Sequence, residues 1–343
     1  MSASIVVAIF AGVLPRIAAY SDVWLTIKEM SSLETSVLLL IGLLNLAAYW
    51  PVQTAVLPGL TTAQAAVSNQ ASTAVANAVP AGGAIGVGVT YAMYSSWGFS
   101  GADVTRSILI SGIWNTFTKL GLPVVALGLL AVTEEAGSSL VAGSLIGMGV
   151  LAASIALFAV GLKSGRLAER MGDLVGRAVS WSRGLVGFPP VTTWGAATSR
   201  FRTTTIDLLS TRWKRLTIAT LVSHLSLYLV LLAALRFAGI AESEVGWSRV
   251  LAAFAFVRLI SALPITPGGL GVVELGYAAT LGIGLEEPAR AGIVAAVLVF
   301  RFITYFLPIP IGTASYLFWR RNQKWRVPGD PPADAEPPEG PGR

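Results

Sequence analysis

Long apolar stretches, separated by short polar segments, dominate the chain. Crossing the hydrocarbon core of a bilayer takes about 20 consecutive apolar residues in a helix. Stretches of this length predict membrane spans at residues 2–20, 35–57, 107–132, 138–162, 216–240 and 290–319. The pattern therefore predicts an all-α, polytopic helical membrane protein.

Two further apolar stretches, residues 64–99 and 248–285, are each interrupted near the middle. The interruptions read Val-Pro-Ala-Gly-Gly at 79–83 and Pro-Ile-Thr-Pro-Gly-Gly at 264–269. Proline removes a helical hydrogen-bond donor, and glycine weakens a helix further. Each stretch is expected to form either a full helical hairpin or a re-entrant segment, and both return the chain to the side from which it came.

The two broken stretches match each other at a constant offset of 186 residues. The matched pairs around the breaks are Gly82 with Gly268, Gly83 with Gly269, and Tyr91 with Tyr277. Matching glycines in two apolar segments indicate an internal repeat. The alternative is an old duplication whose breaks now only allow helices to pack closely.

The order of the predicted spans supports this repeat. Unit one (about 35–132) and unit two (about 216–319) each consist of a span, a broken stretch and a second span. The span at 138–162 lies between the units and reverses the second relative to the first. Inverted-topology repeats of this kind are common in secondary transporters, where broken helices in corresponding positions indicate the binding site.

Composition restricts the function further. Charged residues make up 12% of the 343 residues, against about 25% in soluble domains, which argues against a cytosolic enzyme. Cysteine is absent and His224 is the single histidine, so no metal site or other cofactor is expected. The chain lacks a phosphate-binding Gly-x-x-x-x-Gly-Lys loop and a Gly-x-Ser-x-Gly elbow, and we do not expect an enzyme.

The distribution of charge orients the chain in the membrane. The hydrophilic loop 163–215 holds ten basic residues against three acidic ones, and basic loops remain in the cytoplasm. The basic segment 320–326 is expected on the same side, which places both termini in the cytoplasm and the protein in the cell membrane. The net charge of +6 then meets anionic lipid, and no nucleic acid is expected as a partner. Residues 1–326 form the membrane domain, and 327–343, with six prolines, is expected to be a disordered tail.

One motif carries a family resemblance. Residues 263–274, Leu-Pro-Ile-Thr-Pro-Gly-Gly-Leu-Gly-Val-Val-Glu, resemble the Pro-Gly-Gly-x-Gly-x-x-Glu signature of the lysylphosphatidylglycerol synthase transmembrane family, also called the flippase-like domain family. The resemblance extends to about residue 320. It implies an integral membrane protein that binds a lipid or lipid-linked head group and can flip it between leaflets. The first break departs from many relatives, because Ala81 follows Pro80 where they carry a basic residue.

The namesake proteins fuse this membrane domain to a soluble aminoacyl-transferase domain. In this sequence only the short segment 327–343 follows, so lysyl transfer is not expected.

Polar residues inside predicted spans are the candidate binding residues, since ionisable groups there are costly and normally functional. Arginine binds phosphate in a bidentate manner, lysine binds it as a point charge, and glycines let the backbone approach a ligand closely. The candidate substrate-binding residues are Arg258, Arg301, Lys119, Glu274, Asn115, Gly82, Gly83, Gly268 and Gly269.

Glu274 allows several roles. It can orient an arginine, carry a coupling proton, or form a buried ion pair with Arg258 or Arg301 that only locks helices together. The lipid phosphate is expected between the two broken stretches, held by Arg258, Arg301 and Lys119. The variant Arg301→Ala is then expected to abolish transport and leave expression intact.

The expected function is transport of an anionic or polyprenyl-phosphate-linked lipid. The first alternative is a non-transporting membrane subunit that docks a cell-envelope synthase or a lipid-modifying enzyme through loop 163–215. The second is a membrane-embedded transferase that acts on a lipid phosphate, with Glu274 as its base.

Overall fold

The computed structural model describes residues 20–79, 82–133, 138–163, 165, 194–261, 266–287 and 289–327. Within these ranges every regular element is a helix, and no strand is present. The predicted first span 2–20 and the predicted tail fall almost wholly outside these ranges, as does most of the first half of loop 163–215. The all-α prediction is confirmed for the part of the chain that is described.

Five helical segments are long and apolar enough to cross a membrane. They match the predicted spans after the first one, and the polytopic prediction is confirmed. Their bounds are Ser32–Val56, Gly101–Val132, Leu145–Lys163, Phe201–Phe237 and Ala289–Arg321.

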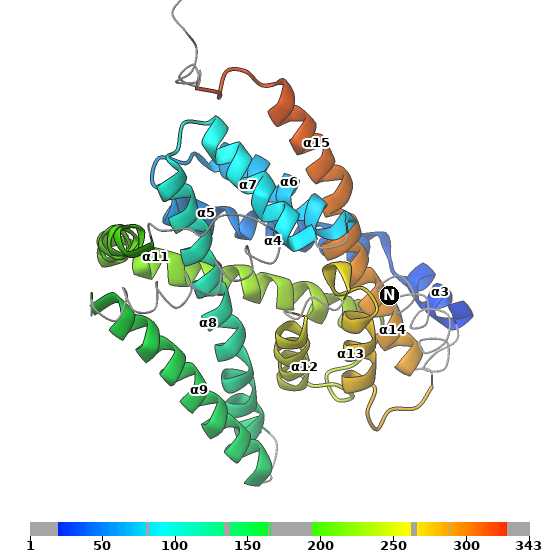
Figure 1. Cartoon of the computed structure of the whole chain (residues 1–343). Coiled ribbons are helices and arrows are strands. Elements are labelled where there is room, and N and C mark those ends of the chain that lie inside the picture. The colour runs from blue at the N-terminus through cyan, green and yellow to red at the C-terminus, as the bar shows by residue number, and fades with distance from the viewer. Residues whose placement is uncertain are drawn as a thin grey trace, which may run out of the picture.

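Twelve α-helices, one 3-10 turn and one π-helical turn make up the described fold (Figure 1). They are α3 (Tyr20–Glu29), α4 (Ser32–Ala48), α5 (Trp50–Val56), α6 (Thr62–Ala78), α7 (Gly82–Ser96), α8 (Gly101–Thr133), α9 (Ser138–Lys163), α11 (Trp194–Phe237), α12 (Trp247–Ile260), η2 (Pro267–Gly269), α13 (Val272–Leu281), α14 (Ala289–Arg301), η3 (Phe302–Phe306) and α15 (Pro308–Arg321).

Both broken stretches form helical hairpins. Helices α6 and α7 pack against each other, and so do α12 and α13, which are joined through η2 (Figure 1). Gly98 and Gly284, which are 186 residues apart, follow the second helix of each hairpin with φ angles of 87° and 76°. The helix boundaries therefore keep the register of the repeat, while its inverted orientation and a re-entrant path stay predictions.

One predicted boundary was wrong. Residues 194–215, assigned to a hydrophilic loop, belong to the 44-residue helix α11, because no proline or glycine interrupts the chain between Gly195 and Gly239. The predicted span 290–319 corresponds to the helical segment Ala289–Arg321, in which a π-helical turn, η3, precedes Pro308, a residue without an N–H to continue the helical hydrogen bonds.

Helices α6 and α15 approach each other closely at Gly312. A Cβ atom at this glycine would run into the carbonyl oxygen of Gln70 and would lie 2.5 Å from the Cβ of Ala74. Small residues at such contacts allow membrane helices to pack backbone to backbone. The contact ties the first hairpin to the C-terminal helix.

The variant Gly312→Val is expected to destabilise the protein by about 1–3 kcal/mol, because α6 and α15 must move apart. Thermal unfolding in detergent measures this loss. Gly149→Val on α9 is the matched control, since an added Cβ there meets no atom within 4 Å. Equal losses in the two variants would contradict the close approach of α6 and α15.

Candidate functional site

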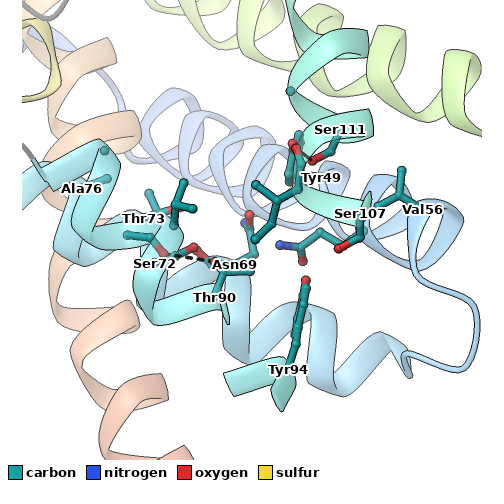
Figure 2. Close-up of a pocket in the computed structure, with 16 residues that line it drawn as sticks. Tyr49, Val56, Asn69, Ser72, Thr73, Ala76, Thr90, Tyr94, Ser107 and Ser111 are labelled. Atoms are coloured by element: carbon teal, nitrogen blue, oxygen red, sulfur yellow. Dashed lines mark hydrogen bonds between the residues drawn. The ribbon is translucent and has the colours of Figure 1, made fainter. Parts of the chain in front are cut away.

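Three adjoining cavities lie between the two hairpins and the helices around them. The hydroxyl cavity has a volume of about 340 Å³ and is lined by residues of α5 to α8, including Asn69, Thr90 and Tyr94 (Figure 2). The middle cavity, of about 280 Å³, is lined by residues such as Asn115 and His224. The arginine cavity, of about 230 Å³, is lined by residues of the second hairpin and of α14. Small-molecule sites are typically about 300–1,000 Å³, so the cavities together suit a ligand.

Neighbouring cavities share lining residues. The hydroxyl and middle cavities have Tyr49, Asn69 and Thr73 in common. The middle and arginine cavities have Leu227, Arg258 and Thr304 in common. The cavities thus form a row from the first hairpin to the second.

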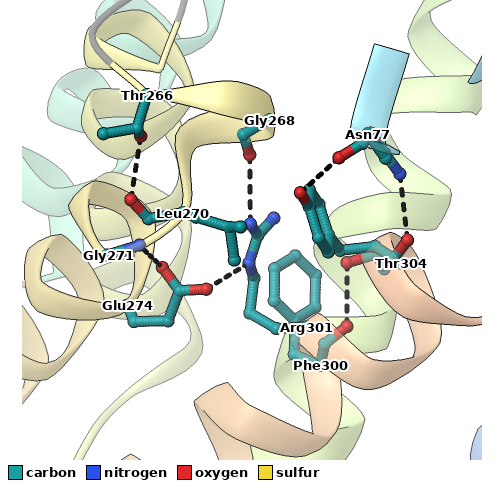
Figure 3. A network of polar contacts seen from close by, with 10 residues as sticks. Asn77, Thr266, Gly268, Leu270, Gly271, Glu274, Phe300, Arg301 and Thr304 are labelled. Atoms are coloured by element: carbon teal, nitrogen blue, oxygen red, sulfur yellow. Dashed lines mark hydrogen bonds and ion pairs between the residues drawn. The ribbon is translucent and has the colours of Figure 1, made fainter. Parts of the chain in front are cut away.

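A buried ion pair stands at the second hairpin (Figure 3). Arg301, the last residue of α14, donates from Nε to Oε1 of Glu274 at 2.6 Å and from Nη2 to the carbonyl of Gly268 at 3.0 Å. Their side chains are only 9% and 1% exposed. The pair holds α13 and the Pro-Gly-Gly turn against α14. Among the roles that the sequence left open for Glu274, this is the buried ion pair that joins helices.

The spacing of the Pro-Gly-Gly-x-Gly-x-x-Glu motif follows from this geometry. Gly268, Gly269 and Gly271 have φ angles of 56°, 70° and 79°, which L side chains rarely adopt. A Cβ at Gly268 would also run into the ring of Tyr305. Gly271 is the residue immediately before α13, and Glu274 is three residues further on. The backbone N–H of Gly271 donates to Oε2 of Glu274 at 2.7 Å, so the glutamate side chain caps the start of α13.

The same network reaches the first hairpin. The guanidinium of Arg301 lies 4.4 Å from the ring centre of Tyr305. The Tyr305 hydroxyl donates to the carbonyl of Asn77 at 2.5 Å, and Nδ2 of Asn77 donates to the carbonyl of Tyr305 at 3.0 Å (Figure 3). Because Asn77 lies in the last turn of α6, these contacts join the breaks of both hairpins.

Arg258 differs from Arg301 in having no ion-pair partner among the residues that the structure describes. It lines both the middle and the arginine cavity, and its Nε atom is buried without a hydrogen bond. The described part of the chain supplies its side chain with no acidic partner, while Lys119 and His224 lie within range of its charge. This region therefore carries positive charge that no neighbouring carboxylate balances.

Other buried polar atoms along the row also lack partners. Buried polar groups are normally hydrogen-bonded, so such atoms have hydrogen-bonding capacity left for water or a polar ligand. They are the Tyr277 hydroxyl, His224 Nε2, Gln70 Oε1 and Gln53 Oε1.

The structure brings most of the predicted site residues to these cavities, and places others beside them. Residues that line a cavity are Arg258, Arg301, Asn115, Gly83 and Gly268. Four predicted residues line none of the three cavities: Glu274, which holds Arg301; Lys119, one turn after Asn115 on α8; and the buried Gly82 and Gly269.

The set of candidate binding residues left out the polar residues of α6 and the Tyr277 hydroxyl. Helix α6 reads Thr-Ala-Gln-Ala-Ala-Val-Ser-Asn-Gln-Ala-Ser-Thr-Ala-Val-Ala-Asn-Ala, which is unusually rich in amides and hydroxyls for an apolar stretch. This high density of amide and hydroxyl side chains was the sequence feature that could have identified α6 as part of the site. Tyr277 is fully buried beside the arginine cavity, whereas its repeat counterpart Tyr91 is 41% exposed.

Fold and site together define a multi-pass helical membrane protein with a buried, arginine-containing polar site between two broken-helix hairpins. Residues 2–312 match the family described as Lysylphosphatidylglycerol synthase TM region, and the chain belongs to this family. No curated protein matches the chain. Membership confirms the resemblance seen in the Pro-Gly-Gly motif and indicates a role related to membrane lipids.

Proposed function

We propose that the protein binds a lipid with a phosphate-containing head group in the row of cavities and moves it between the leaflets of the cell membrane. The observation that carries this proposal is Arg258, which lines two adjoining cavities, has a buried Nε without a hydrogen bond, and finds no acidic partner in the described part of the chain. An isolated charge in such a place is costly unless a counter-charge joins it. A lipid phosphate supplies that charge and accepts the guanidinium hydrogen bonds.

The charged residues then divide into two roles. Arg258 binds the phosphate, and Lys119 adds positive charge within its range. Arg301 positions the Pro-Gly-Gly turn, because its charge is already balanced by Glu274. We propose a carrier in preference to a transferase for the same reason: the carboxylate that a transferase would need as base is engaged by Arg301 and by Gly271.

The cavity wall offers a route for a lipid. Val87 of α7 lines the hydroxyl cavity and is 47% exposed, and Ile85 on the same helix is 49% exposed. An apolar exposed surface beside a polar cavity lets acyl chains stay in the bilayer while the head group enters. In the proposed inverted repeat, the second hairpin would give the head group an equivalent route to the other leaflet.

A flipping assay in reconstituted vesicles tests the proposal. The probe is fluorescent phosphatidylglycerol, whose arrival in the outer leaflet is read by chemical quenching. Arg258→Gln is expected to slow flipping at least tenfold, because a charge-assisted hydrogen bond contributes about 1.5–3 kcal/mol. Arg290→Gln is the control, since Arg290 is an exposed arginine on α14 that lines none of the three cavities.

The outcome separates the candidate functions. Flipping by Arg258→Gln at the wild-type rate would overturn the phosphate site. Wild-type vesicles that flip no faster than protein-free vesicles would overturn transport. They would favour the alternative of a membrane subunit that docks a cell-envelope synthase or a lipid-modifying enzyme, for which the basic residues Arg212, Lys214 and Arg215 of α11 supply a surface.

A further inference from the structure

The hydroxyl cavity has a chemistry that phosphate binding does not explain. Its described lining carries nine hydroxyl or amide side chains and no lysine, arginine, aspartate or glutamate. Figure 2 shows several of them, from α6, α7 and α8, directed toward one space. A cavity without charge matches neither a phosphate nor an ammonium group.

The Tyr94 hydroxyl accepts from Ser68, whereas most serine and threonine hydroxyls of the lining are arranged as acceptors for a ligand. Four of them donate their proton to a carbonyl of their own helix, at distances of 2.8–3.1 Å. The donors are Ser72 to Asn69, Thr90 to Gly86, Ser107 to Val104, and Ser111 to Ile108. Their oxygen lone pairs stay available to a ligand that donates.

Gln53 adds an unused acceptor. The residue is 7% exposed, lines the hydroxyl cavity, and its Oε1 atom is buried without a partner. A neutral wall rich in acceptors fits a group with several hydroxyls, because each hydroxyl has a proton to donate. An ammonium group would also donate, but the unbalanced charge of Arg258 in the adjoining middle cavity disfavours a second cation.

The charged residues of the site and the neutral polar residues of the hydroxyl cavity occupy different units of the repeat. At the offset of 186 residues, the charged Arg258, Glu274 and Arg301 of the second unit correspond to uncharged residues of the first. The corresponding pairs are Arg258 with Ser72, Glu274 with Gly88, and Arg301 with Asn115. Arg258, Glu274 and Arg301 thus all come from the second unit, whereas the uncharged lining of the hydroxyl cavity comes entirely from the first.

We infer that the head group is a phosphodiester that carries an uncharged polyol, such as a cyclic polyol or a sugar. The inference rests on the proposed function, since it places the phosphate at Arg258. The polyol occupies the hydroxyl cavity, which joins the middle cavity at Tyr49, Asn69 and Thr73. One ligand then satisfies both the unpaired arginine and the neutral acceptors.

Binding of two lipids to the full chain in detergent tests the inference. Dioleoyl phosphatidylinositol and dioleoyl phosphatidylserine have the same acyl chains, a phosphodiester and one net negative charge, but only the first carries a neutral polyol. The inositol lipid is expected to bind at least tenfold more tightly, which corresponds to about 1.4 kcal/mol. Equal affinities would overturn the inference and leave the phosphate site intact.

A pair of glycine variants tests the location. Gly83 and Gly88 both lie exposed on α7, and an added Cβ at either meets no atom within 4 Å, but only Gly83 lines the hydroxyl cavity. Gly83→Leu is expected to bring the ratio of the two affinities close to one by weakening inositol-lipid binding alone. Gly88→Leu is expected to keep the ratio.

A second pair of glycine variants controls for a folding defect in the first pair. Gly112 lines the hydroxyl cavity and Gly128, also on α8, does not; an added Cβ meets no atom within 4 Å at either. Gly112→Leu is expected to abolish the preference and Gly128→Leu to keep it. A preference that survives in both Gly83→Leu and Gly112→Leu would overturn the hydroxyl cavity as the polyol site.

Two further measurements separate this inference from the proposed function. If neither lipid binds and Arg258→Gln flips lipid at the wild-type rate, the proposed function and the inference are both overturned. Soluble glycerophosphoinositol is expected to compete at least a hundredfold more weakly than the lipid. Equal competition would support a polyol phosphate ligand but would overturn a lipid as its source.

Discussion

Glu274→Gln is expected to remove about 3–5 kcal/mol of stability, the largest loss that we predict for a single substitution. The carboxylate lies 2.6 Å from Arg301 Nε, and both side chains are buried. Removing its charge leaves the arginine in an apolar interior without a counter-charge. Thermal unfolding in detergent, in the absence of added anionic lipid, measures the loss.

The double variant Glu274→Leu with Arg301→Met is expected to recover part of that loss, although it leaves the N–H of Gly271 and the carbonyl of Gly268 without these partners. Replacing both members of a buried pair by apolar residues of similar volume removes the unbalanced charge. The control is Asp103→Asn, which breaks the ion pair with Arg106 at 2.9 Å. Asp103 is 42% exposed there, so the expected cost is below about 1 kcal/mol. A double variant no more stable than Glu274→Gln would contradict the pairing.

This ion pair changes one expectation drawn from the sequence. Arg301→Ala was expected to abolish transport and leave expression intact. In the structure, Arg301 is the counter-charge of the buried Glu274 carboxylate and the hydrogen-bond donor to the carbonyl of Gly268. The variant would remove both interactions, so we now expect less folded protein. Lost transport in Arg301→Ala would therefore not identify a phosphate ligand, and Arg258 is the more informative position.

The fold was predictable where bilayer physics constrains the sequence. Spans such as 107–132 and 138–162 follow from the thickness of the hydrocarbon core, and both hairpins follow from proline and glycine in an apolar stretch. The full length of α11 was not predictable from hydropathy, because residues 194–215 are polar and still helical. Hydropathy indicates where a helix is apolar and not where it ends.

The sequence indicated the charged residues of the apolar segments, but not which of them form an ion pair. Arg258 and Arg301 are both arginines in apolar segments near Glu274, and the sequence left open which of them the glutamate binds. The choice depends on the Pro-Gly-Gly turn, whose positive φ angles bring Gly268 and Glu274 onto α14. The hydroxyl cavity was missed because serine and threonine in a helix bond to their own carbonyls, a pattern that sequence alone cannot separate from packing.

Arg258→Met is expected to have the opposite effect on stability from Glu274→Gln. The guanidinium has a buried Nε without a partner and lies near the charge of Lys119. A methionine of similar length removes the cost of desolvation and repulsion, so the lipid-free protein should gain about 1–3 kcal/mol. Residues kept for binding commonly reduce stability in this way.

The same variant should no longer respond to anionic lipid. Dioleoyl phosphatidylglycerol, added in detergent, is expected to raise the unfolding temperature of the wild type, because a ligand that binds only the folded state stabilises it. Without lipid, Arg258→Met should unfold at a higher temperature than the wild type, and added lipid should not raise this temperature further. The exposed control Arg290→Met should behave as the wild type. A fall in stability as large as that of Glu274→Gln would show that Arg258 holds the fold together and would remove it from the binding site. A gain in stability with no lipid response identifies Arg258 as a cation whose partner is supplied by the ligand.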